Sequence, residues 1–317
     1  TRQRVGVGLI CQSGIHFVGP NKFSGMIGKG IDLGNSCDIG FYDALRYFAE
    51  DPDIQVVAIH MEGLNQAREF LTLAARVVKE KPIIVHKSGR SETAAKAAMS
   101  HTGSLAGNYK ILQAALRQNG VTLLEDSGQM PYAVKTLQHL PPMKGNRVAV
   151  ITFSGAAGII ISDNLEKYGF RLAALGSGVI DQLAKLSPDW MPLSNPLDIW
   201  PAVMMHGASK VYSLALKAVL KDPNVDGIIC VAIAPLPEFS FLNVSEALND
   251  AVQASPQKKP VIGWIYGPNS KEVQMQFEST NRIMVYPTLE LATRALSWLK
   301  ERYKTIARGD KEFMQKT

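Results

Sequence analysis

The stretch VAVITFSGAAG, residues 148–158, decides the fold that we expect. Its apolar and β-branched start indicates a buried strand, Ser154-Gly155 forms a turn, and the small residues that follow open a helix. The stretch RVGVGLICQSG, residues 4–14, has the same order of a buried strand followed by Ser-Gly. Buried strands that alternate with helices are typical of a parallel sheet covered on both faces.

Two further pairs of landmarks repeat between the halves of the chain. Asp51-Pro52 and Asp222-Pro223 each precede an apolar strand, and Lys81-Pro82 and Lys259-Pro260 each precede the next one. Helical patterns lie between these strands, as over residues 65–80. The repeated order predicts two similar α/β domains rather than a short-period array.

A cluster of Pro and Gly marks the boundary between these domains. It has the sequence PPMKGN and follows a helical piece. Such clusters are typical of linkers. We therefore expect a first domain over 1–128, a linker over 129–146 and a second domain over 147–317.

The composition excludes several classes of protein. Of 317 residues, 46% are hydrophobic and 20% are charged, as in a globular protein with a full core. The net charge is +6, but Lys and Arg are scattered, which favours anionic small molecules over nucleic acid as partners. No apolar run reaches membrane-spanning length, so we expect no membrane contact.

The three cysteines indicate the cellular compartment. Cys11, Cys37 and Cys230 lie far apart, without the spacing of a disulfide framework or a zinc site. We therefore expect a reducing cytoplasm and no metal site. The sequence starts at Thr1 directly before a strand, which leads us to expect a fragment or a processed piece of a longer protein.

Two positions suit a bound phosphate. Ser13-Gly14 and Ser154-Gly155-Ala156, here called the first and second Ser-Gly corners, follow predicted strands. At such strand ends the next helix offers free N–H groups and the positive end of its dipole. We expect both corners to bind phosphate, although Ser-Gly after a strand is also common turn chemistry.

The stretch GRSETAAKAAMSHTGSLAG, residues 89–107, carries His101. Only Met99 and Leu105 in it are large and apolar, so we expect an exposed loop that presents the histidine. An imidazole can act as a nucleophile near neutral pH, and a phosphoryl group on it would carry nearly two negative charges. The alternative interpretation is an Ala-rich surface helix with a solvated histidine.

Glu62 closes the predicted strand 54–61, on the edge of the sheet from which the loop of His101 starts. Its carboxylate could accept a hydrogen bond from one ring nitrogen of His101, which would fix the tautomer and leave the other nitrogen free to attack phosphorus. The alternative is a surface glutamate at a strand end.

These residues carry a family resemblance. The loop sequence of His101, with Glu62-Gly63 upstream and Asn195-Pro196-Leu197-Asp198 downstream, resembles the NDP-forming acyl-CoA synthetases, relatives of the succinyl-CoA synthetase α-subunit. The resemblance covers nearly the whole chain and implies two flavodoxin-like ligase domains in tandem. It implies that His101 is a phosphohistidine supported by Glu62, with the two Ser-Gly corners as phosphate cradles.

The resemblance also implies an enzyme, an acid-thiol ligase that interconverts a small-molecule acid, CoA and ATP with acyl-CoA, ADP or GDP, and phosphate. The family's CoA-binding domain and ATP-grasp domain have no counterpart here, so both are expected as partners. CoA and ATP or ADP with Mg are then substrates of the complete enzyme, no cofactor is bound within this chain, and the assembly is an oligomer.

The segment after Gly14 departs from the family pattern. The family has a long helix of small and apolar residues there, whereas Ile15 is followed within a few residues by Pro20, which a helix tolerates only in its first turn. We expect a short or displaced helix. This departure favours one rival interpretation, a non-catalytic binding or scaffolding module. A second rival is the same domain pair inside a fused regulator or acyltransferase, where His101 is present but need not turn over.

Overall fold

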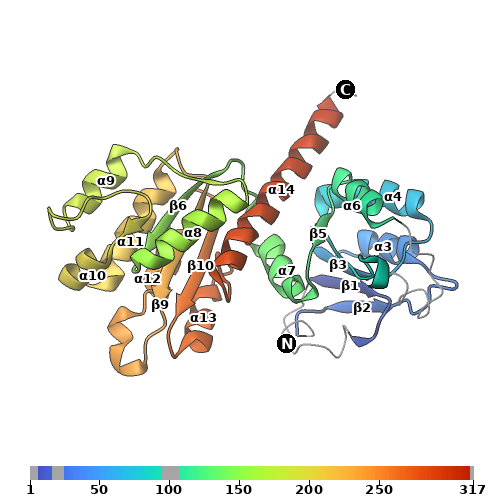
Figure 1. Ribbon diagram of the computed structural model, residues 1–317, viewed down its shortest axis with the longest axis horizontal. Helices are drawn as coiled ribbons and strands as arrows, with labels where there is room; N and C mark the ends of the chain where they lie inside the picture. Colours follow the sequence, from blue (N-terminus) through green and yellow to red (C-terminus); the bar gives the residue numbers. More distant parts are fainter. Residues whose placement is uncertain (1–5, 16–24, 95–107, 315–317) are drawn as a thin grey trace. The chain divides into compact units, whose positions relative to one another are not determined.

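The computed structural model describes residues 6–15, 25–94 and 108–314. The chain divides into two compact units, Thr1–Gln138 with Glu301–Thr317, and His139–Lys300 (Figure 1). His101 and most of the segment after Gly14 lie outside the described residues. Among the described residues, no helix combines the length and the apolar composition that a membrane crossing requires.

The first unit contains a parallel sheet of five strands in the order β2-β1-β3-β4-β5. The strands are β1 (Val7–Cys11), β2 (Lys29–Asp32), β3 (Val56–Met61), β4 (Ile83–Lys87) and β5 (Thr122–Leu124). The helices are α3 (Phe41–Glu50), α4 (Ala67–Glu80), α6 (Tyr109–Gln118) and α7 (Met130–His139), with a 3₁₀ turn η1 (Ser127–Gln129).

The core of this unit explains its uninterrupted apolar strands. Every residue of β1 and β3 is buried, as expected for parallel strands with both faces covered. Phe48 of α3, Phe70 of α4 and Leu116 of α6 belong to one cluster with Ile59 of β3, so these three helices cover the same face. The carboxyl ends of the strands remain available for a site.

The second unit contains a parallel sheet in the order β11-β10-β9-β6-β7, with β8 paired to β6. The strands are β6 (Arg147–Thr152), β7 (Arg171–Leu172), β8 (Leu197–Asp198), β9 (Gly227–Ile233), β10 (Val261–Tyr266) and β11 (Ile283–Val285). The helices are α8 (Gly155–Lys167), α9 (Ser177–Ala184), α10 (Trp200–His206), α11 (Ala208–Lys221), α12 (Ser245–Gln253), α13 (Ser270–Glu278) and α14 (Leu289–Met314), with a 3₁₀ segment η2 (Pro237–Leu242). Helix α14 continues into the first unit, to which its residues from Glu301 onward belong.

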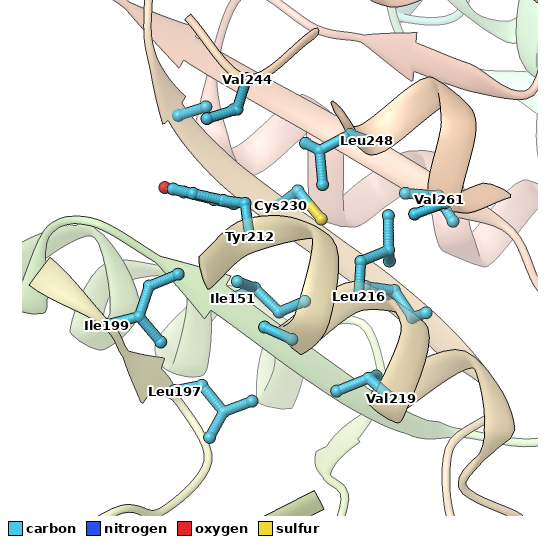
Figure 2. Packing of buried hydrophobic residues seen from close by; sticks show 14 of the residues in the cluster. Ile151, Leu197, Ile199, Tyr212, Leu216, Val219, Cys230, Val244, Leu248 and Val261 are labelled. Carbon is cyan, nitrogen blue, oxygen red and sulfur yellow. The ribbon is translucent and has the colours of Figure 1, made fainter. Parts of the chain in front are cut away.

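The face of this sheet that α11 covers holds a continuous core. Tyr212 and Leu216 of α11 pack with Ile151 of β6 and Cys230 of β9 (Figure 2). The Tyr212 hydroxyl donates to the carbonyl of Val231, which satisfies the one polar atom of this buried ring. Helix α8 lies across the other face (Figure 1), so both faces of β6 are covered up to the turn at Ser154.

The repeated landmarks have a common structural role. The Lys81 ammonium donates to the carbonyls of Phe48, Ala49 and Asp51 at 2.7–2.9 Å, at the end of α3. The Lys259 ammonium does the same at the end of α11, at 2.5 Å from the carbonyl of Asp222. A cation satisfies the unpaired carbonyls of a helix C-terminus. The predicted pair of α/β units with parallel sheets is confirmed.

Candidate functional site

The first Ser-Gly corner follows β1, beside the end of β2. Cys11, the last residue of β1, is in register with Asp32, the last residue of β2. A Cβ atom on Gly14 would lie 3.3 Å from Oδ2 of Asp32, so only a glycine fits here without displacing that carboxylate. Ser13 is half-buried and Gly14 is exposed.

Gln12 links this corner to Glu62. The side-chain oxygen of Gln12 accepts hydrogen bonds from the backbone N–H groups of Glu62 at 2.8 Å and Gly63 at 3.0 Å. Gln12 is only 7% exposed, so these bonds are shielded from water. The predicted residues Ser13, Gly14 and Glu62 therefore lie on the same edge of the first sheet, joined by a residue that we did not predict.

The second Ser-Gly corner is a capped helix N-terminus. The hydroxyl of Ser154, the N-cap of α8, accepts from the N–H of Ala157 at 3.4 Å. The Ser154 N–H donates to the Thr152 hydroxyl at 2.9 Å, and that hydroxyl donates to the Ser154 carbonyl at 2.8 Å. The N–H groups of Gly155 and Ala156 precede the first intrahelical bond, so they lie at the positive end of the helix dipole.

The side chain of Asn195 forms hydrogen bonds with the sheet backbone next to this corner. Its side-chain amide accepts from the Val150 N–H at 2.9 Å and donates to the carbonyls of Val148 and Ala173 at 2.8 and 3.0 Å. The amide therefore takes the place of a strand between β7 and β8, along the edge of β6. The Asn195–Pro196 peptide bond is cis.

Asp198, the last residue of β8, faces Gly155. A Cβ atom on Gly155 would lie 2.9 Å from Oδ2 of Asp198, so any side chain at this position requires that carboxylate to move. Burial raises the pKa of Asp198, and the backbone N–H of Trp200 only partly offsets this effect. A carboxyl group of this kind can accept or donate a proton closer to neutral pH than an ordinary aspartate.

The sequence alone did not single out Gln12, Asp32 or Lys87. Gln12 and Lys87 end or follow apolar strands, where a polar residue resembles an ordinary strand terminus. The structure shows that Gln12 and Lys87 are buried although they are polar, and buried polar residues need partners. Among the described residues, no group of three or more His, Cys, Asp and Glu side chains could hold a metal ion.

Comparisons with known proteins place both units. The family model of the succinyl-CoA ligase-like flavodoxin domain matches residues 4–137, and that of the Ligase-CoA domain matches residues 148–311. The sequence is 31% identical, over 309 residues, to the α subunit of acetate–CoA ligase [ADP-forming] II from Pyrococcus furiosus. It is 27% identical, over 270 residues, to the 4-hydroxybutyrate–CoA ligase [ADP-forming] of Nitrosopumilus maritimus.

A solved structure shows the same fold. The dinucleotide-forming acetyl-coenzyme A synthetase 1 of Ca. Korarchaeum cryptofilum, in complex with phosphate and ADP, superimposes with a TM-score of 0.81 at 30% identity over 97% of this chain and 66% of that one. The Pyrococcus match covers 96% of this chain and 64% of that subunit, and the Nitrosopumilus match covers 84% and 37%. This chain therefore spans only part of the length of these relatives.

The matches confirm the predicted tandem of flavodoxin-like ligase domains. The Ligase-CoA domain alone accounts for more than half of the chain, and the flavodoxin domain precedes it in the order predicted from the sequence. The chain belongs to the family of the NDP-forming acyl-CoA synthetases, relatives of succinyl-CoA ligase.

Proposed function

We propose that this chain is the ligase part of an NDP-forming acyl-CoA synthetase that passes phosphate through His101. ATP gives its γ-phosphoryl group to a ring nitrogen of His101 and leaves as ADP. The acid's carboxylate then attacks phosphorus, which breaks the N–P bond and gives an acyl phosphate and free His101. The CoA thiol loses its proton and attacks the acyl carbon, and phosphate leaves.

The second Ser-Gly corner is the observation that carries this proposal. Ser154 caps a helix of thirteen residues, so Gly155 and Ala156 offer fixed N–H groups at the positive end of its dipole. A doubly charged phosphoryl group gains most from such a fixed arrangement, because the donors need no reorganisation when it arrives. In the first unit, the bonds from Gln12 fix the backbone at Glu62, the proposed partner of the His101 ring.

The complete reaction needs further parts. The matched Pyrococcus relative is named as an α subunit and is longer than this chain. We propose that an ATP-grasp domain or subunit and a CoA-binding domain complete the enzyme, and that these parts bind CoA and the nucleotide with its Mg. The relatives are named for different acids, acetate and 4-hydroxybutyrate, so their names do not identify the acid. A cytoplasmic, oligomeric enzyme remains our prediction.

Labelling with γ-³²P-ATP tests the proposal. The chain is incubated with its ATP-grasp partner, and we expect a label on the chain that is lost in acid and kept in base, as phosphohistidine requires. His101→Ala should abolish this label, whereas His206→Ala, at the end of α10, should retain it. A label that persists in His101→Ala excludes this histidine as the carrier, and the absence of label in the unsubstituted chain favours a non-catalytic module of the same fold.

A further inference from the structure

Lys87 is a buried cation next to the proposed site. It is the last residue of β4, is only 8% exposed, and is the residue from which the chain leaves the sheet toward His101. A buried charge is costly unless hydrogen bonds and an opposite charge compensate it. Its ammonium donates to the carbonyl of Ser88, which satisfies one of its three N–H groups.

The opposite charge comes from Glu62. Burial lowers the pKa of Lys87. The Glu62 carboxylate opposes this shift because it stabilises the ammonium, whereas the positive charge of Arg90 lowers the pKa further. The two residues are held at neighbouring strand ends, because Met61 and Lys87 are in register and the Ser88 N–H donates to the Met61 carbonyl at 3.0 Å. Glu62 is half-buried, so its interaction with Lys87 is only partly screened by water.

Glu62, at the end of β3, thus has Gln12 on its β1 side and Lys87 on its β4 side. Gln12, from the β1 side, binds the backbone N–H groups of Glu62 and Gly63, which fixes the main chain but leaves the carboxylate able to rotate. The Lys87 ammonium, on the β4 side, attracts this carboxylate, because the two opposite charges lie at neighbouring strand ends that are partly shielded from water. In the sequence, the chain continues from Lys87 and Ser88 into the segment that contains His101.

We infer that Lys87 is a positioning residue of the proposed phosphoryl-transfer site, which acts through Glu62 by drawing its carboxylate to the end of β4. This inference rests on the proposed function for its consequence, the orientation of the His101 ring. The electrostatic pairing of Lys87 with Glu62 is independent of it and can be measured in the chain alone.

The first experiment measures this pairing by NMR. The chain is labelled with ¹³C at the lysine ε carbon, the Lys87 signal is assigned from its loss in Lys87→Arg, and its titration is followed with pH. Glu62→Gln should lower the pKa of Lys87 further, since it removes the compensating charge. The matched control Glu69→Gln removes an exposed carboxylate from the first turn of α4 and should leave the Lys87 titration unchanged. An unchanged titration in Glu62→Gln overturns the inference.

The second experiment is a double-mutant cycle on His101 labelling by γ-³²P-ATP, with the ATP-grasp partner present. Lys87→Met should slow labelling by about tenfold, the effect of a 1.4 kcal/mol interaction. In the Glu62→Gln background the same substitution should have no further effect, because its target is gone. Lys87→Arg, which keeps the charge, should restore most of the rate.

The outcomes separate the two proposals. Equal slowing by Lys87→Met in both backgrounds shows that Lys87 acts independently of Glu62 and overturns the inference. If Lys87→Met fails to fold, the Lys87 titration in Glu62→Gln and the rate of Lys87→Arg decide instead. If the unsubstituted chain takes no label while Glu62→Gln still shifts the Lys87 titration, the proposed function fails and the electrostatic pairing stands.

Discussion

The two Ser-Gly corners share a plan but are fixed by different means. At each, a glycine faces an aspartate from the neighbouring strand, Gly14 with Asp32 and Gly155 with Asp198. In the second unit, the local backbone and the hydroxyls of Thr152 and Ser154 fix the corner. In the first unit, the side chain of Gln12 connects the corner to the next strand.

This difference suggests a division of roles. A capped helix N-terminus presents fixed donors and suits the binding of an anion. A side-chain bridge between two strand ends instead fixes the position of the residue that it holds, here Glu62. We therefore expect substitutions at the second corner to weaken phosphate binding and those at the first to disturb the orientation of Glu62.

The largest effect is expected at Asn195. Asn195→Ala removes three hydrogen bonds within the second sheet and should lower the free energy of unfolding by about 3 kcal/mol. Urea unfolding measures this change, with Ser194→Ala, at the exposed neighbouring residue, as the control. Gln12→Ala removes the two bonds from the N–H groups of Glu62 and Gly63 and a longer one, 3.4 Å, from Gln12 to the Ser36 hydroxyl, and should cost about 2 kcal/mol. A larger loss for Gln12→Ala would contradict the expectation that the Asn195 side chain contributes more to stability than the Gln12 side chain.

The next effect concerns phosphate at the second corner. Gly155→Val places a Cβ atom 2.9 Å from Oδ2 of Asp198. The new side chain would also cover the N–H groups of the first turn of α8. We expect His101 labelling by γ-³²P-ATP to fall about 100-fold, as when one donor of an anion site is removed. Gly178→Val, in the first turn of α9 with open space around it, is the matched control. Equal rates in both variants would argue against phosphate binding at this corner.

A smaller effect, on the pH dependence of the free energy of unfolding, distinguishes the amino ends of the strands in the two sheets. Asp226 accepts two hydrogen bonds at 2.9 Å from the Arg147 guanidinium. Burial alone would raise the pKa of Asp226, but these bonds hold it below its usual value. Since the pKa is lower in the folded state, this stabilisation is present above the unfolded pKa, near 3.9, and is lost as the pH falls through the folded one.

Asp226→Asn should therefore lower the free energy of unfolding by about 2 kcal/mol at pH 7, and the difference from the unsubstituted protein should shrink below pH 4. Urea unfolding at pH 7 and pH 3 measures it. The neutral residue Gln55 occupies the corresponding place in the first unit, because its N–H donates to the Gly6 carbonyl as that of Asp226 donates to the Arg147 carbonyl. Gln55→Ala should show no such pH dependence. A difference for Asp226→Asn that is constant with pH would exclude the ion pair as its cause.

The smallest effect concerns the reactivity of the buried thiols, one in each unit. Burial raises the pKa of Cys11, in β1, to about 11 and that of Cys230, in β9, to about 12, whereas Cys37 is exposed. A thiol reagent at pH 8 should therefore modify Cys37 within minutes and the other two only after denaturation. Mass spectrometry of native and denatured samples counts the labels. Fast modification of Cys11 would show that the first corner opens more readily than the second unit's core.

The fold could be predicted because its signals are local and repeated. The apolar strands, the Ser-Gly turns and the lysines before Pro82 and Pro260 each reflect a constraint within a few residues, and together they fix the order of the elements. The lysines proved informative for a reason that the sequence does not show. Each satisfies carbonyls at the end of a helix more than thirty residues upstream.

The site could be predicted only in part. Ser154 was evident, because a serine before small residues at a strand end is a recognised cap. Asn195 was noted in the sequence only through the family resemblance. Its hydrogen-bond partners Val150, Val148 and Ala173 lie 45, 47 and 22 residues upstream, so no local pattern indicates its role. In the sequence, Gln12 and Lys87 look like ordinary polar residues at the ends of strands. Their roles depend on Glu62, which lies beside them only because the strands pair. Contacts between distant segments leave no periodic signal in a single sequence.

The return of the chain at its C-terminal end affects the order of folding. Arg302 of α14 donates to the carbonyls of Val78, Lys79 and Glu80, so the end of α4 receives its partner from a residue more than two hundred positions later. The first unit, although most of it precedes the second in the sequence, therefore cannot form this contact until the segment that contains Arg302 has been synthesised. The second unit, which is continuous in sequence, is thus inserted between two segments of the first.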